Sequence, residues 1–221
     1  MNQTENFWDA SADNYDRTEE RFEAIHRRSR ENARRHVKPT DVVLDYGCGT
    51  GTTACDLAPR VKSVHGIDIS SKMVDLAQQK AREGGIGNAT FARVDIFDGS
   101  FEAESFDVIL AFNILHTIPD PQASIRRMHA LLKPNGVMIS VTPAFRDRSS
   151  LLGFLQIMLV RTLCLLGVIS IPIRSVSRSD LEQLVQQSGG FIIIDDESIF
   201  RGTSSHFMVA QKAAGPVAAE V

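Results

Sequence analysis

The stretch that decides the fold is Val42-Val43-Leu44-Asp45-Tyr46-Gly47-Cys48-Gly49-Thr50-Gly51. It opens with a short apolar run, which predicts a buried strand. Three glycines follow, and then a helical pattern over residues 52–60. Glycine permits tight turns and a close approach of a ligand to the backbone, and the first turn of a helix offers unpaired N–H groups. Strand, glycine loop and helix in this order therefore predict a loop that binds a nucleotide-like ligand.

Helices and strands alternate over most of the chain. The early strands are continuous apolar runs, which indicates a sheet covered by helices on both faces. This pattern predicts an α/β, doubly wound fold. The expected strands lie at residues 42–44, 63–69, 89–94, 106–111, 137–141, 191–195 and 206–211, and the expected helices at 5–36, 52–60, 72–83, 119–132 and 178–188.

Length and composition are those of an ordinary globular protein. The 221 residues predict one domain over 1–212, with a helical N-terminal arm over 1–36 and a flexible tail over 213–221. The net charge of -3 includes no long basic run, so nucleic-acid binding is not expected. The three cysteines lack CxxC spacing, and no metal is expected. The N-terminus lacks the apolar core of a signal peptide, which predicts a cytoplasmic protein.

Residues 151–173 are strongly apolar and stand apart from the alternating pattern. Gln156 and Arg161 interrupt the segment, so a membrane-spanning helix is the least favoured interpretation. We predict two short amphipathic helices within an insertion over 144–176 that caps the site. A lid over a hydrophobic substrate fits the same pattern. Peripheral contact with a membrane, aided by flanking arginines, remains a further alternative.

Three aspartates follow three successive expected strands. Asp45 precedes the glycine loop, where a carboxylate repels a pyrophosphate and suits a ligand that carries an ammonium group. Asp68 comes about twenty residues later, the spacing at which an acidic side chain grips ribose hydroxyls. Asp95 ends the third strand and is placed to meet an adenine amino group. Asp68 has the alternative role of a helix cap, which Ser70 fills better, and aspartate is common in loops, which weakens the case for Asp95.

With these motifs, the sequence resembles the class I S-adenosylmethionine (SAM)-dependent methyltransferase family, in its small-molecule branch. The matching residues cover most of 42–142 in the order that the family requires. They are 43–51, 66–73, 95–96, 106–109 with 115–116, and 131–136. The resemblance implies a Rossmann-like sheet of about seven strands, mainly parallel, with an antiparallel last strand.

The resemblance also implies that the cofactor is SAM. Asp45 and the glycine backbone would hold its methionine part, Asp68 its ribose and Asp95 its adenine, while Tyr15 closes over it. The residues expected to contact the cofactor are Tyr15, Asp45, Tyr46, Gly47, Cys48, Gly49, Gly51, Asp68, Ile69, Met73, Asp95, Ile96 and Asn113.

The implied reaction moves a methyl group from SAM to an oxygen, nitrogen or sulfur of a small, hydrophobic acceptor. Such a displacement needs alignment and a dry pocket more than acid–base groups. His116 is the candidate base, because imidazole titrates near neutral pH, and Tyr15 is a second catalytic candidate. A structural role for His116 is an equal alternative.

Other function classes remain open. One is a protein that binds SAM without transferring its methyl group, and another is an enzyme that methylates a lipid or quinone at a membrane surface. A nicotinamide-dependent oxidoreductase shares this kind of fold, but Asp45 before the loop argues against it. The expected partner is the small acceptor, and the expected assembly is a monomer or homodimer.

Overall fold

The computed structural model describes residues 3–144, 146–147, 174–200 and 204–213, together with the single positions 155, 158, 159 and 162. Most of the two helices expected in 151–173, and most of the expected tail, lie outside the described residues. The helices are α1 (Gln3–Ser11), α2 (Tyr15–Glu19), α3 (Glu23–Ala33), α4 (Thr52–Leu57), α5 (Ser71–Glu83), α6 (Pro121–Leu131) and α8 (Arg178–Gln187), with 3-10 turns η1 (Ala12–Asn14), η2 (Glu20–Phe22) and η3 (Ala58–Arg60).

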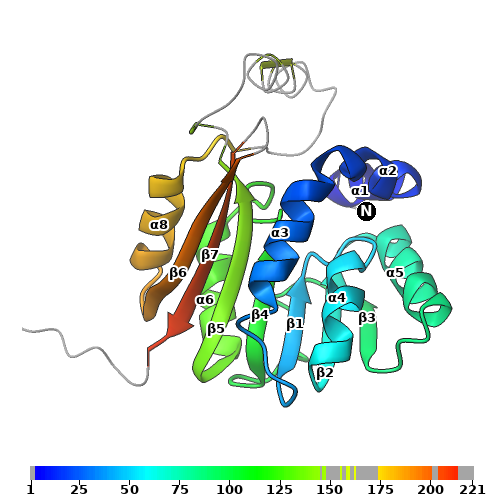
Figure 1. Cartoon of the computed structure of the whole chain (residues 1–221), viewed down its shortest axis with the longest axis horizontal. Helices are drawn as coiled ribbons and strands as arrows, with labels where there is room; N and C mark the ends of the chain where they lie inside the picture. Colours follow the sequence, from blue (N-terminus) through cyan, green and yellow to red (C-terminus); the bar gives the residue numbers. More distant parts are fainter. Residues whose placement is uncertain are drawn as a thin grey trace, which may run out of the picture.

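A seven-stranded sheet forms the centre of the molecule, as expected. Its strands are β1 (Val42–Tyr46), β2 (Ser63–Asp68), β3 (Ala89–Arg93), β4 (Phe106–Phe112), β5 (Leu132–Pro143), β6 (Phe191–Phe200) and β7 (Ser204–Lys212). Their spatial order is β3-β2-β1-β4-β5-β7-β6 (Figure 1). Strands β1 to β5 pair in parallel, and β7 is antiparallel to both of its neighbours, β5 and β6. The predicted mainly parallel sheet with an antiparallel last strand is therefore confirmed.

Alternate residues of the central strands feed two separate cores. In β1, Val43 packs with helices α3, α4 and α5, whereas Leu44 packs on the opposite face with α6 and α8. Val108 and Ile109 of β4 divide in the same way. Burying both faces requires the continuous apolar runs seen in the sequence. The polar groups that end β1, β2 and β4 are thereby brought to one edge of the sheet, where the strand order reverses.

The N-terminal arm differs from the single helix expected over 5–36. The helical dihedrals are interrupted at Asn14 and again at Phe22, so the arm consists of short pieces. These breaks allow α1 and α2 to bend over the carboxyl ends of the parallel strands while α3 packs against the sheet (Figure 1). The bend places part of the arm above the glycine loop.

Two strands are longer than expected. β5 begins at Leu132 rather than 137, because the Pro134-Asn135-Gly136 turn is taken up as an irregularity in its pairing with β4. β6 continues to Phe200 through a shift of register between Ile193 and Asp195. Among the described residues, no helix has the length and apolar character needed to cross a membrane.

Candidate functional site

The glycine loop follows β1 and is held by the end of β2. The backbone N–H groups of Gly47 and Cys48 both donate to the carbonyl oxygen of Ile67, at 2.8 and 3.0 Å. The N–H of Gly49 donates to Asp68 Oδ2 at 3.0 Å. These bonds fix the shape of the loop without using any ligand.

Two of the loop glycines leave no room for a side chain. A Cβ added at Gly47 would lie 2.4 Å from Ile114 Cδ1, and one at Gly51 would lie 2.7 Å from Ala77 Cβ. Gly49 is different, because a Cβ there would meet Tyr15 Cε1 alone, at 3.7 Å. All three have positive φ angles, which glycine adopts most easily. Glycine is therefore needed at 47 and 51 because neighbouring residues pack tightly against the backbone. At Gly49 the backbone stays open toward two cavities.

Two adjoining cavities, of about 310 and 430 Å³, surround the loop. They share Tyr15, Gly47, Gly49, Phe112 and Asn113. The first, here called the adenosine cavity, is also lined by Asp68, Ile69, Met73 and Asp95. The second, here called the methionine cavity, is also lined by Asp45, Cys48 and Thr50. The residues assigned to the two halves of SAM thus fall into two adjoining spaces.

Asp45 is the most unusual group in the methionine cavity. Its side chain is 2% exposed, and its Oδ2 has no hydrogen-bond partner in the described part of the chain. Burial and the nearby Asp68 carboxylate raise its pKa to about 7. A buried carboxylate with a free oxygen is costly unless a cation pairs with it. The site therefore fits a ligand that brings an ammonium group, as the sequence predicted.

The other two aspartates, Asp68 and Asp95, line the adenosine cavity and differ in burial and in hydrogen bonding. Asp68 accepts from the N–H groups of Gly49 and Ser70, and burial raises its pKa despite these bonds. Ser70 caps α5 by accepting from the N–H of Met73 at 3.1 Å, so Asp68 is not needed as the helix cap. Asp95 is exposed and accepts from Phe97 N at 2.9 Å.

The N-terminal arm closes one side of both cavities. Trp8 and Tyr15 line the adenosine cavity and meet edge to face, with ring centroids 6.3 Å apart. Burial raises the pKa of Tyr15 above its ordinary value, so its hydroxyl is a neutral donor at neutral pH. Asp16 anchors this part of the arm by accepting from Thr50 Oγ1 at 2.6 Å.

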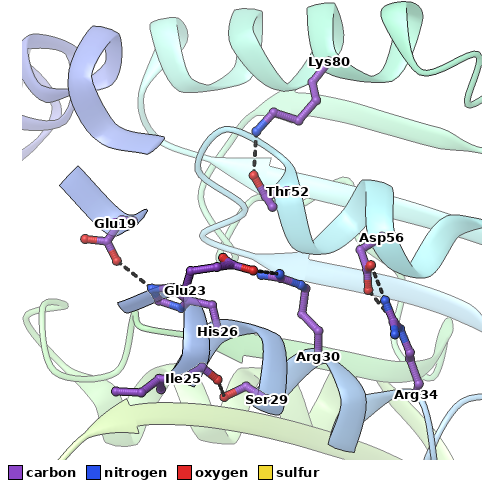
Figure 2. A network of polar contacts seen from close by, with 10 residues as sticks. All are labelled: Glu19, Glu23, Ile25, His26, Ser29, Arg30, Arg34, Thr52, Asp56 and Lys80. Atoms are coloured by element: carbon purple, nitrogen blue, oxygen red, sulfur yellow. Dashed lines mark hydrogen bonds and ion pairs between the residues drawn. The ribbon is translucent and has the colours of Figure 1, made fainter. Parts of the chain in front are cut away.

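Cations line the methionine cavity beside the acidic arm. Figure 2 shows Lys80 pointing from α5 to Thr52, and Arg30 bonded to Glu23 along α3. The Arg30 guanidinium lies 2.7 Å from Glu23, and Lys80 lies 2.9 Å from Asp16. Neither cation is evident from the sequence, because nothing in the spacing of the arm or of α5 distinguishes Arg30 or Lys80 from its charged neighbours. Both are candidates for a ligand carboxylate, the second charged group of a methionine moiety.

Comparison with known proteins decides the family. A family model described as a methyltransferase domain matches residues 38–197, well over half of the chain. The protein belongs to the class I SAM-dependent methyltransferases. The match begins just before β1 and includes the glycine loop and all three aspartates.

Individual curated relatives share part of the length of this chain. A ubiquinone biosynthesis O-methyltransferase of Coxiella burnetii is 35% identical over 100 residues, which are 45% of this chain and 42% of the relative. An aklanonic acid methyltransferase of a Streptomyces species (strain C5) is 34% identical over 107 residues, 47% of this chain and 49% of the relative. The chain thus spans under half the length of these curated relatives.

A solved structure supports the fold over nearly the whole chain. The magnesium protoporphyrin IX methyltransferase of Synechocystis PCC 6803, determined with bound S-adenosylhomocysteine, has a TM-score of 0.72 and 20% identity. The likeness covers 95% of this chain and 98% of that one. At this identity the likeness shows the fold alone.

Three of the residues predicted for the site do not line either cavity. Ile96 is fully buried in the core beneath the Asp95 turn, and Gly51 packs against α5. His116 is buried beside the cavities, and its carbonyl oxygen accepts from Arg174 N at 2.9 Å. Burial lowers the pKa of His116 to about 4, which makes it a weak base. Its catalytic role stays a prediction, and the structural role is its alternative.

Three further predicted contacts line the cavities. Tyr46 lines the adenosine cavity, where its hydroxyl lies 3.5 Å from Ser124 Oγ and burial raises its pKa to about 12. Cys48 is a buried thiol whose pKa burial raises, which leaves it inert. Asn113 has a positive φ of 55°, and its backbone N–H donates to the carbonyl oxygen of Val141 at 2.7 Å.

Proposed function

We propose that this protein transfers a methyl group from SAM to a nucleophilic atom of a small acceptor. The observation that carries the proposal is the free oxygen of buried Asp45 at the head of the glycine loop. It calls for a ligand with a cationic hydrogen-bond donor, which SAM provides through its amino group, whereas the pyridinium ring of NAD has no N–H to donate. The shape of the two cavities and the family membership support the same ligand.

In the proposed complex, the chain's residues bind and orient. Asp45 holds the amino group, Arg30 or Lys80 faces the carboxylate, Asp68 accepts from the ribose hydroxyls and Asp95 from the adenine amine. SAM supplies an electrophilic methyl group on its sulfonium sulfur. Tyr15 covers the region where the two cavities meet and excludes water from it.

We propose an acceptor with a nucleophilic oxygen on an apolar, ring-containing body as the first class to test. Two curated relatives are named for ubiquinone biosynthesis and for aklanonic acid. The adenosine cavity is also lined by Phe112, Ile114 and Ile118, apolar residues that are not among those expected to hold SAM, and they suit such an acceptor. Nitrogen and sulfur acceptors, and a protein that binds SAM without transfer, are the other outcomes of an acceptor screen.

The domain limits and location stay proposals as well. We propose a single domain over 1–212, with the arm at 1–36, a cap at 144–176 and a flexible tail at 213–221, acting in the cytoplasm as a monomer or homodimer. Leu155, Met158 and Leu159 are helical, and they are 55%, 44% and 60% exposed although they are apolar. These exposed apolar residues support either a lid or peripheral contact with a membrane, and co-sedimentation with anionic vesicles distinguishes the two.

A ligand comparison tests the proposal directly. Calorimetric titration of the full chain with SAM, S-adenosylhomocysteine and NAD should give binding of the first two and none of the third. Methyl-labelled SAM, offered with phenols, quinols, amines and thiols, then reports transfer and the atom that is methylated. Binding of NAD without binding of SAM would overturn the proposal. SAM binding without transfer to any acceptor would favour the binding protein.

A further inference from the structure

Three side chains that can bind a metal ion lie close together, and none of them lines either cavity. They are Glu182 on α8, Asp196 on β6 and His206 on β7. One ligand atom of each lies within 4.8 Å of the corresponding atoms of the other two. Acidic clusters alone are common on protein surfaces, so the buried histidine is what distinguishes this cluster.

His206 is buried without a hydrogen-bond partner. Its side chain is 1% exposed, and neither Nδ1 nor Nε2 has a partner within the described part of the chain. Thr142, its register partner on β5, also has a buried hydroxyl without a partner there. Buried polar groups are nearly always paired, so an imidazole with two unused nitrogens points to a missing ligand.

A bulge in β6 brings Asp196 to this site. Before the shift of register, Phe191 and Ile193 face the core shared with α8. After it, Glu197 and Ile199 face α3, through bonds from Glu197 to Arg28 and Asn32 and the packing of Ile199. Asp196 is thereby turned to the α8 side. Bulges of this kind often re-aim a side chain beside a functional site.

Arg178 is the cation now in contact with the carboxylates. Its Nη2 lies 2.5 Å from Asp196 and its Nε 2.6 Å from Glu182. Its side chain is 46% exposed and sits on the first turn of α8, so it is free to swing into solvent. Arg178 does not serve His206, because neither ring nitrogen of that histidine has a partner in the described part of the chain. A divalent cation satisfies the imidazole and both carboxylates at once.

We propose that Glu182, Asp196 and His206 bind one divalent transition-metal ion that displaces Arg178. One imidazole and two carboxylates suit Zn²⁺, Co²⁺ or Mn²⁺ better than Mg²⁺ or Ca²⁺. The ion ties α8 to the β6–β7 pair. Its role is structural, because none of its three ligands lines the adenosine or methionine cavity.

The test uses the full chain, stripped with a chelator and titrated with Co²⁺ or Zn²⁺. We expect one equivalent to bind, with visible Co²⁺ absorption bands and a rise in the melting temperature. Asp196→Asn should weaken binding by at least about 100-fold, as loss of a ligand does more than loss of an outer partner. The matched control is Asp195→Asn, which changes the neighbouring residue that bonds His36 instead and should bind as wild type does.

Arg178→Ala keeps the proposal falsifiable should a ligand variant fail to fold. Removing the competing cation should raise the affinity for Zn²⁺ by about tenfold. An unchanged or weaker affinity would show that Arg178 does not compete with a metal ion for these carboxylates, and would contradict the proposed displacement. Equal Co²⁺ spectra for Asp196→Asn and Asp195→Asn would overturn the site as well.

Discussion

The glycine loop and the N-terminal arm line the same cavities, and they are held in place by different forces. The loop is continuous with β1, and its N–H groups are bonded to Ile67 and Asp68 at the end of β2. The arm is held largely by charged and polar side chains at its surface. Glu5 pairs with Arg93, Asp9 accepts from Ser70, and Asp16 contacts Lys80.

We call the glycine loop, residues 47–51, the fixed wall of the cavities. We call the part of the arm that covers them, from α1 to α2, the movable wall. The loop cannot shift without breaking backbone bonds and the core beneath it, so its shape is set before any ligand arrives. The pair between Asp16 and Lys80 is partly exposed, and such pairs are individually weak and screened by salt, so this part of the arm can open at small cost. We expect the loop to determine which ligand binds and the arm to determine how fast it enters and leaves.

The largest expected effect comes from a substitution in the fixed wall. Gly51→Ala places a Cβ 2.7 Å from Ala77 Cβ at a φ of +76°, so both strain and overlap oppose it. We expect a loss of about 3 kcal/mol in the free energy of unfolding, measured by denaturant titration. Gly85→Ala is the matched control, because Gly85 has a φ of +63° with nothing within 4 Å of its added Cβ. Equal losses in the two variants would mean that the loop yields easily.

The next effect concerns the charge at the head of the loop. Asp45→Asn keeps the size of the side chain and removes its charge, so SAM should bind more weakly by about 2 kcal/mol, or roughly 30-fold. Calorimetry of the variant measures this loss. Asp41→Asn alters another buried aspartate, at the opposite end of β1 and away from both cavities, and should leave SAM affinity unchanged. Wild-type affinity in Asp45→Asn would remove the ammonium contact from the proposal.

The same carboxyl group gives the ligand-free protein a pH dependence. The Asp45 pKa is about 7 when folded, against an ordinary value of 3.8. Its contribution to stability is therefore complete below about pH 4 and is lost as the pH rises through 7. Relative to Asp45→Asn, the wild type should lose about 2 kcal/mol between pH 5 and pH 8. Denaturation of both proteins at these pH values checks the sign, and parallel curves would contradict the raised pKa.

Where the two walls meet, Tyr15 offers a smaller effect. Its ring lies against Gly49 and lines both cavities. Tyr15→Ala should weaken SAM binding by about tenfold through lost apolar contact, while Tyr15→Phe should stay within about twofold of wild type. A large loss in the Phe variant would assign a role to the hydroxyl instead of the ring.

The fixed wall is also the part that the sequence predicts well. The apolar run of β1, the glycines and Asp45, Asp68 and Asp95 lie within short segments whose spacing reflects local geometry. Local geometry also identifies Ser70 as the cap of α5, and the structure agrees. These features depend on neighbours in the chain, which a single sequence contains.

Features made by distant contacts were not predictable in this way. The break of the arm at Asn14, the inward position of Arg30 and the burial that lowers the pKa of His116 all depend on how separate elements pack. The bulge in β6 is a further case, because the run of Ile192, Ile193 and Ile194 shows no sign of a change of face. Neither composition nor periodicity contains this information.

The smallest expected effect lies in the movable wall. Asp16→Asn weakens a contact with Lys80 in which both side chains are partly exposed, so stability should change by less than about 1 kcal/mol. The rate at which SAM dissociates should rise by about two- to fivefold, and added salt should raise the wild-type rate in the same direction. Stopped-flow displacement measures both. Glu197→Gln breaks a similar surface pair, with Arg28, away from both cavities, and should leave the rate unchanged. Equal rates in the two variants would show that the arm does not control entry.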